Sequence, residues 1–154
     1  MNRKLITLLA ILIAVTNISA VSAFDFGSLF SSDENKTVNI DGMNFNVPGG
    51  FQENTTNAAQ EAKAALEKQG LNVTTKIYMK DSKAVGFYVS NYTNLGLSSD
   101  QVLSSFNGSS TTIKNITGFM REDEGAYIFS YTKDGCVIFI ISNDKNLIND
   151  VLIA

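Results

Sequence analysis

The sequence predicts an α+β fold, in which an antiparallel sheet of about six or seven strands carries three helices packed mainly on one face. Two observations carry this prediction. Short segments of alternating apolar and polar residues follow one another, separated by turn-forming pairs such as Asp41-Gly42. Three other segments repeat apolar residues at helical spacing. Because no internal repeat or low-complexity segment divides the chain, residues 37–154 are expected to form a single globular domain.

The first 23 residues have the three-part pattern of a secretory signal peptide. Arg3 and Lys4 form a basic start, and the apolar core Leu5–Val15 is followed by small and turn-tolerant residues. Val21 and Ala23 suit the small-residue pockets of a signal peptidase, so cleavage is predicted after Ala23. The mature chain is therefore expected in the extracellular space or the cell envelope.

Two alternatives to this cleavage stay open. In the first, cleavage follows Ala20. In the second, Leu5–Val15 is not removed and anchors the chain in a membrane. A membrane-spanning helix needs about 20 apolar residues, which is longer than this core. No later apolar stretch is long enough to span, so the mature domain is not expected to cross a membrane.

Composition narrows the function classes. Removal of residues 1–23 takes away two of the 12 basic residues and none of the 15 acids, leaving a net charge of about −5. An acidic surface disfavours nucleic acid as a partner. The chain has no histidine, which removes the commonest general base and the commonest ligand of catalytic zinc. We therefore expect no enzyme activity, no metal and no cofactor.

The first half of the mature chain predicts a linker, a hairpin, a helix and two strands. Residues 24–36 are expected to be a linker or N-terminal arm, and residues 37–46 a hairpin about Asp41-Gly42. Alanines at helical spacing predict a helix over residues 57–69. Alternating segments then predict strands over 72–80 and 84–93.

The second half predicts two helices and three strands. Ser98 and Gln101 have capping-box spacing at the start of a short helix. Strands are predicted over 111–120, 126–132 and 136–142, and the last is apolar on both faces, as a central strand would be. Either Asn143 or Asp144 is expected to cap a final helix.

Two segments carry a resemblance to known proteins. The opening Val38–Phe51 (VNIDGMNFNVPGGF) and the Asp144–Ile148 segment (DKNLI) resemble small uncharacterised exported proteins of methanogenic archaea. The strand followed by Pro-Gly and an aromatic residue is, more distantly, similar to domains of the PsbP/Mog1-like fold. That fold hosts unrelated functions, so the resemblance implies a shape, and no catalytic residue carries over.

Six asparagines lie in Asn-x-Ser/Thr sequons, which are acceptor sites for N-glycosylation. Glycans at these positions would coat the surface with bulky polar groups. The alternative is that a chain rich in Asn and Thr makes sequons by chance. Asn54 and Asn107, in predicted loops, are expected to be better acceptors than the three in or beside strands. The six are Asn35, Asn54, Asn72, Asn91, Asn107 and Asn115.

The aromatic residues of the 126–132 strand are a candidate binding face. Tyr127 and Tyr131 share one side of this strand, where they could contact a sugar or a peptide. The alternative is ordinary sheet packing, because aromatic residues favour strands. No partner can be named from the sequence; another envelope protein or a glycan would fit.

Cys136 and the acidic run at residues 122–124 each have a functional and a purely structural interpretation. Cys136 is the single cysteine, so no disulfide forms within one chain; it is either a buried apolar residue or a thiol that pairs two chains. The acidic run Glu122-Asp123-Glu124 either holds calcium or is a solvated turn. Calcium needs six to eight oxygens, and three adjacent acids cannot all point inward.

Three functions follow from these observations. The first is an exported, non-catalytic binding or structural domain at the cell surface. The second is an extracytoplasmic assembly or accessory factor, as the PsbP/Mog1-like shape implies. The third is a hydrolase with a carboxylate site, for which the sequence offers no defined pair of acids.

Overall fold

The computed structural model describes residues 33–55, 57–68 and 70–154; the side chains of residues 57–59, 61 and 62 are left out. The predicted signal peptide, its cleavage residue Ala23 and linker residues 24–32 lie outside the described residues. Of the predicted linker, Lys36 is already the first residue of a strand.

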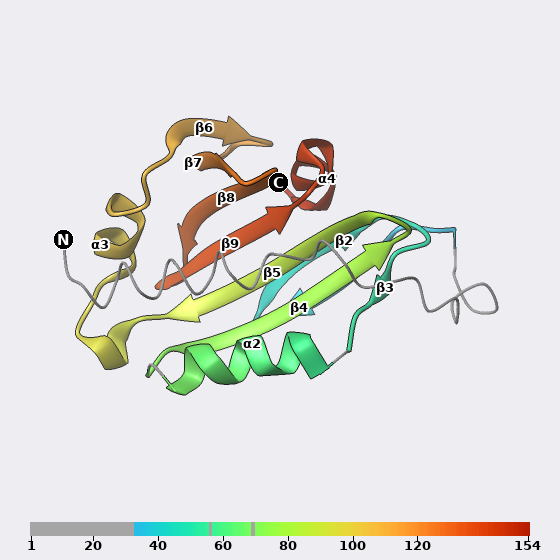
Figure 1. Cartoon of the computed structure of the whole chain (residues 1–154). Helices are drawn as coiled ribbons and strands as arrows, with labels where there is room; N and C mark the ends of the chain where they lie inside the picture. The colour runs from blue at the N-terminus through green and yellow to red at the C-terminus, as the bar shows by residue number, and fades with distance from the viewer. Residues whose placement is uncertain (1–32, 56, 69) are drawn as a thin grey trace.

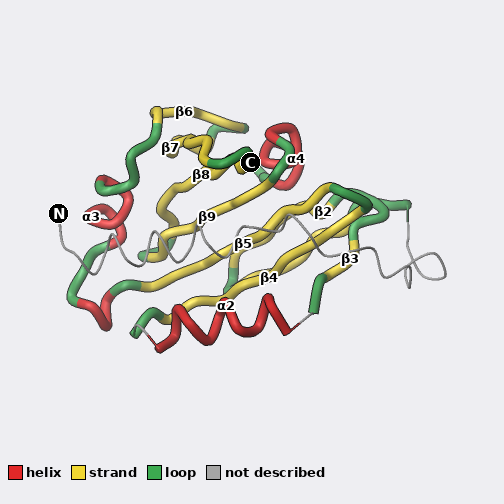
Figure 2. Tube along the Cα trace, viewed as in Figure 1, coloured by secondary structure: helices red, strands yellow, loops and turns green. Residues whose placement is uncertain are grey.

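Strands make up about half of the described chain (Figure 2). A two-stranded hairpin contains β1 (Lys36–Ile40) and β2 (Met43–Val47). The helices are α2 (Asn57–Lys68), α3 (Ser99–Ser104) and α4 (Lys145–Val151), with a 3-10 turn η1 (Thr93–Leu95). The remaining strands are β3 (Gln52–Glu53), β4 (Asn72–Lys80), β5 (Lys83–Asn91), β6 (Ser109–Ile113), β7 (Ile116–Asp123), β8 (Ala126–Lys133) and β9 (Cys136–Ser142).

Seven of these strands form one antiparallel sheet in the order β3-β4-β5-β9-β8-β7-β6 (Figure 1). The β4–β5 hairpin and the β6–β9 meander are its two halves, and they meet where β5 pairs with β9. The predicted α+β class, with an antiparallel sheet and three helices, is confirmed.

The sheet is buried on both faces. On one face, the β1–β2 hairpin and α4 pack over the strands and form the hairpin-side core, which includes Phe45, Phe87 and Ile148. On the other face, α2 and α3 form the helix-side core with residues such as Leu66 and Phe106. Of the three helices in the described residues, two therefore share a face, and the third lies with the hairpin on the opposite one.

The central strand β9 shows how the sequence produces this two-sided sheet. Phe139 and Ile141 belong to the helix-side core, whereas Ile138 and Ile140 belong to the hairpin-side core. Each of these four is 0–1% exposed. Because side chains alternate along a strand, an apolar run with no polar residue requires cover on both sides.

One predicted strand is wrong. The sequence predicts a single strand over 111–120, but the chain turns at Lys114-Asn115 and forms the β6–β7 hairpin. Both turn residues have positive φ, 47° and 66°, as a two-residue hairpin turn requires. Asparagine enters this region more easily than most residues, so the turn forms without glycine.

Two predicted helix starts are resolved. The Ser98–Gln101 capping box is present: Ser98 Oγ accepts from the Gln101 backbone N–H at 3.2 Å, and Gln101 Oε1 accepts from the Ser98 N–H at 2.9 Å. At α4 the cap is Asp144, not Asn143. The short strand β3 and the turn η1 were not predicted.

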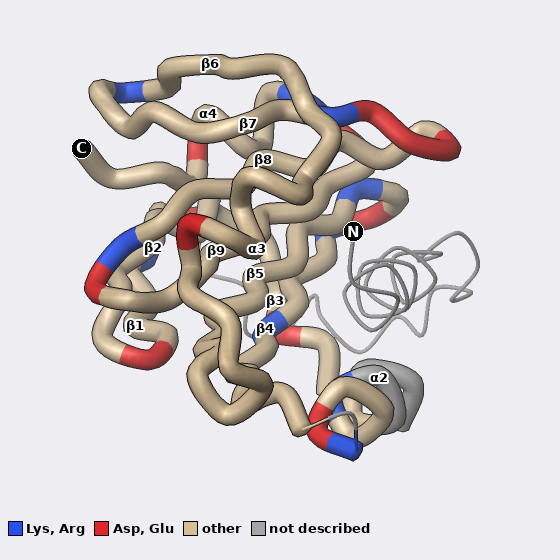
Figure 3. The backbone as a smooth tube through the Cα atoms, turned by 90° about the vertical axis from the view of Figure 1, so that its left-hand side faces the viewer, with Lys and Arg blue, Asp and Glu red and all other residues tan. Residues whose placement is uncertain are grey.

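Charged residues lie mostly at turns and strand ends of the described chain (Figure 3). None of the described helices is long and apolar enough to cross a membrane.

Candidate functional site

An open surface hollow of about 440 Å³ lies where the β4–β5 turn meets the start of α4. Three segments that are far apart in the sequence line it. The β4–β5 turn and the start of β5 contribute Ser82 and Lys83, and β8 contributes Tyr127. The β9–α4 connection and the start of α4 contribute residues 143–146. The side chains of this lining are an aromatic ring, two amides, a hydroxyl, a carboxylate and two ammonium groups.

Asn143 joins two walls of the hollow. Its Oδ1 accepts a hydrogen bond from the Ala84 N–H at 2.9 Å, and its Nδ2 donates to the Ser82 carbonyl at 2.6 Å. The buried Ser142 beside it donates from Oγ to the Ala84 carbonyl at 2.7 Å. These contacts fix the β9–α4 connection against the β4–β5 turn.

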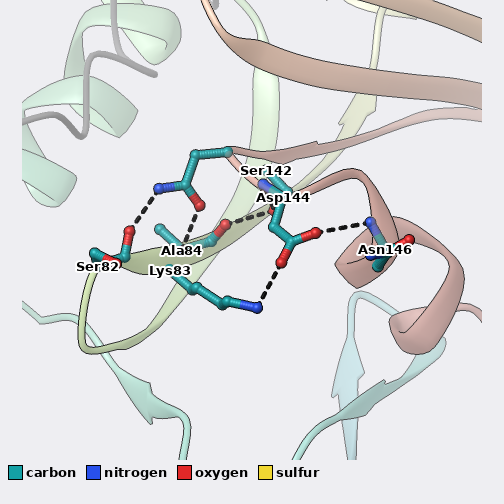
Figure 4. Close-up of polar contacts among 7 residues, drawn as sticks. Ser82, Lys83, Ala84, Ser142, Asp144 and Asn146 are labelled. Atoms are coloured by element: carbon teal, nitrogen blue, oxygen red, sulfur yellow. Dashed lines mark hydrogen bonds and ion pairs between the residues drawn. The ribbon is translucent and has the colours of Figure 1, made fainter.

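Asp144 lies at the centre of the polar contacts (Figure 4). Its Oδ1 accepts from the Asn146 N–H at 2.9 Å, which caps α4, and its Oδ2 lies 2.6 Å from Lys83 Nζ. The Lys83 hydrogen bond, followed by the Asn146 N–H, lowers the pKa of this carboxyl. The same contact raises the pKa of Lys83. Asp144 is therefore a fixed anion rather than a proton donor.

These groups suit binding better than proton transfer. The carboxylate is already paired with an ammonium group, so it is a weak general base. Asn146 and Lys145 are exposed and offer hydrogen-bond donors, and the half-buried Tyr127 offers a ring. A ligand with a polar rim and one apolar face would match this set.

The two tyrosines of the predicted binding face have different environments. Tyr127 is half-buried and lines the hollow. Tyr131 is 5% exposed, its ring lies 5.7 Å from that of Phe129, and burial raises its pKa to about 12. Tyr131 is therefore a core residue, and only Tyr127 reaches a surface where a ligand could bind.

The six sequon asparagines are spread over the surface, and their environments differ. Asn35, Asn72, Asn107 and Asn115 are exposed. Asn54 and Asn91 are half-buried, and each makes side-chain contacts within the fold. The expectation that Asn54 is more accessible than Asn72 and Asn115 is wrong, because its amide packs against Met79 and Asn115 is at the tip of a hairpin.

The described residues around Cys136, and around the acidic run at residues 122–124, do not form a functional site. Cys136 is half-buried against the hairpin-side core, and burial, Asp41 and Asp134 raise its pKa, which disfavours the reactive thiolate. Asp123 forms an ion pair with Arg121, while Glu122 and Glu124 are exposed. Among the described residues there is no cluster of three potential metal ligands.

Sequence reasoning missed Ser82, Lys83 and Asn143 as members of one site. Ser82 and Lys83 read as an ordinary turn, and Asn143 as a candidate cap. Their joining depends on the pairing of β5 with β9, which aligns Val85 with Ser142. No local signal in the sequence encodes that register.

Comparison of the chain with protein-family models, curated proteins and solved structures found no match. The resemblance drawn from Val38–Phe51 and Asp144–Ile148 stays a prediction.

Proposed function

We propose that this chain is an exported, non-catalytic domain that binds a neutral glycan in the hollow between the β4–β5 turn and α4. The observation that carries the proposal is the lining itself, in which the Tyr127 ring stands beside amides and a fixed ion pair. A sugar ring has an apolar C–H face and a rim of hydroxyl groups. The ring of Tyr127 matches the first, and Asn143, Asn146 and Ser82 match the second.

The lining of the hollow carries one net positive charge, which does not oppose a neutral glycan. Lys83 and Asp144 neutralise each other, and the exposed Lys145 supplies the remaining charge. The Asn143 bonds to the β4–β5 turn keep the walls at a fixed spacing. Such preorganisation lowers the entropic cost of binding.

Calorimetric titration of the purified protein with maltotriose and chitotriose tests the binding. We expect one of them to bind, and Tyr127→Ala to weaken that binding about tenfold or more, because it removes the ring. Tyr127→Phe should retain most of the affinity. Tyr131→Phe, on the same strand but in the core, is the matched control and should bind as the unaltered protein does. Equal binding by Tyr127→Ala, with circular dichroism confirming its fold, would contradict the proposed site.

The intact mass of the protein from its own cells tests export. A chain that begins at Phe24, recovered from the medium or the envelope, is the expected result. A full-length chain retained in the cytoplasm would contradict export.

A further inference from the structure

The six sequon asparagines differ in the contacts that their side chains already make within the fold. Asn54 Nδ2 donates to Met79 Sδ at 3.2 Å. Asn91 Oδ1 accepts from both the N–H and the hydroxyl of Thr93, at 2.9 and 2.5 Å, so both members of that sequon are engaged with each other. A glycosyl group on either amide would have to displace these contacts.

Two other sequon asparagines are exposed, but a neighbouring group restricts access to the amide of each. Asn35 Oδ1 accepts from the Gly49 N–H at 3.0 Å, which ties the start of β1 to the end of β2. Asn72 lies directly opposite Asn91 across the β4–β5 pair, and its partner Thr74 is half-buried. Directly opposed side chains are about 5 Å apart, so Asn72 is crowded by its neighbour.

The amides of Asn107 and Asn115 have neither obstacle; the Thr117 hydroxyl of the second sequon is hydrogen-bonded to the Thr112 hydroxyl at 3.0 Å. Both asparagines are exposed, and so are the hydroxyl residues of their sequons, Ser109 and Thr117. Asn107 lies in the connection that leaves α3, and Asn115 lies at the tip of the β6–β7 turn. The two therefore stand just before and just after one strand, β6.

That strand is an open edge of the seven-stranded sheet. Its sequence, Ser109–Ile113 (SSTTI), carries no charge, and in the described part of the chain only β7 pairs with it. Unpaired N–H and C=O groups on such an edge are a template for another chain. The opposite edge of the sheet is protected from pairing with another chain in a different way. Its strand β3 has two residues, and Glu53 in this strand forms an ion pair with Lys76.

The geometry points to Asn107 and Asn115 as N-glycan attachment sites whose glycans flank β6 and keep its edge from pairing with a second chain. This inference rests on the export proposed above, because the donor is a polyprenyl-phosphate-linked oligosaccharide on the far side of the membrane. In the transfer, the donor's C1–O bond breaks and a C1–Nδ2 bond forms. The amide loses one proton, and the lipid-linked phosphate leaves with the bonding electron pair.

Peptide mapping by mass spectrometry of the protein from its own cells tests the sites. We expect a glycan mass on the peptides of Asn107 and Asn115, and unmodified Asn54 and Asn91. Glycans on Asn54 or Asn91 with none on Asn107 and Asn115 would overturn the assignment. So would an unmodified chain that begins at Phe24, and this result would leave the proposed export standing.

The proposed role of the two glycans in blocking the β6 edge is tested with the chain produced in a host that lacks N-glycosylation. We expect this chain to self-associate in light scattering as its concentration rises, and Ser110→Lys, which places a charge on β6, to restore the monomer. Asn94→Lys, at another exposed position in η1, is the matched control and should not restore the monomer. The proposed role of the glycans would be overturned if the glycan-free chain stayed monomeric. It would also be overturned if that chain self-associated both with and without Ser110→Lys.

Discussion

The Asp144 side chain makes two of the polar contacts that hold the hollow together. It caps α4 through Asn146 and pairs with Lys83, and both contacts favour its ionised form. A carboxyl whose folded-state pKa is lowered stabilises the fold above its ordinary pKa of about 3.9, and loses that contribution as the pH falls through the lowered value. Asp144 therefore contributes to acid denaturation. Because Lys83 is largely exposed, the contribution is small and is screened by salt.

Asp144→Asn isolates this charge, because asparagine still caps a helix. We expect the variant to have a lower melting temperature than the unaltered protein near pH 7, and the difference to close below about pH 4. It should also narrow in strong alkali, where Lys83, with its raised pKa, finally loses its proton. Melting curves from pH 2 to 12 measure this. Glu122→Gln, on the exposed part of β7, is the control, and a constant offset for Asp144→Asn at every pH would contradict the account.

Single residues also limited what the sequence could predict about the site. Strand periodicity places both Tyr127 and Tyr131 on the candidate binding face, because periodicity assigns a residue to one side of a strand and does not give its exposure. Whether that side faces solvent depends on the β1–β2 hairpin and α4, which cover it from distant parts of the sequence.

At the scale of elements, the segments with a local signal were predicted well. β9 and β4 have the predicted bounds, because the first is continuously apolar and the second ends at a clear turn. The β6–β7 hairpin was missed because Ser109–Ile113 is almost free of apolar residues and its turn lacks glycine. Strands built from serine and threonine at a sheet edge leave no alternation to detect.

The helix α3 offers an element-scale test of a local signal. Its six residues are too few to be stable alone, so the capping box and the burial of Val102 must hold it. Ser98→Ala should lower the free energy of unfolding by about 1 kcal/mol, because the Gln101 N–H loses its acceptor. Urea denaturation measures this. Ser99→Ala, at the first helical residue, is the matched control; an equal loss there would show that capping is not the cause.

At the scale of the whole molecule, the two cores share one sheet. Adjacent residues of β9 therefore report on opposite faces: Ile140 lies in the hairpin-side core and Ile141 in the helix-side core, and both are 0–1% exposed. Because every strand of the sheet except the edge pieces contributes to both faces, neither core is expected to melt without the other.

Ile140→Val and Ile141→Val test this coupling. Each should lower the free energy of unfolding by about 0.5–1.5 kcal/mol, the usual cost of deleting one buried methylene. Both should shift a single transition without changing the dependence on urea, as followed by circular dichroism and tyrosine fluorescence. Two separated transitions in either variant would show that the cores unfold independently.

The pairing of β5 with β9 also sets the order in which the molecule can be completed. Phe87 meets Ile140 across a stretch of about 50 positions, and β9, which joins the two halves of the sheet, comes after the other described strands in the sequence. A chain delivered N-terminus first can form the β4–β5 hairpin early, but β5 keeps one side unpaired until β9 has also been delivered. The joining of the two halves of the sheet is therefore expected to be a late step of folding.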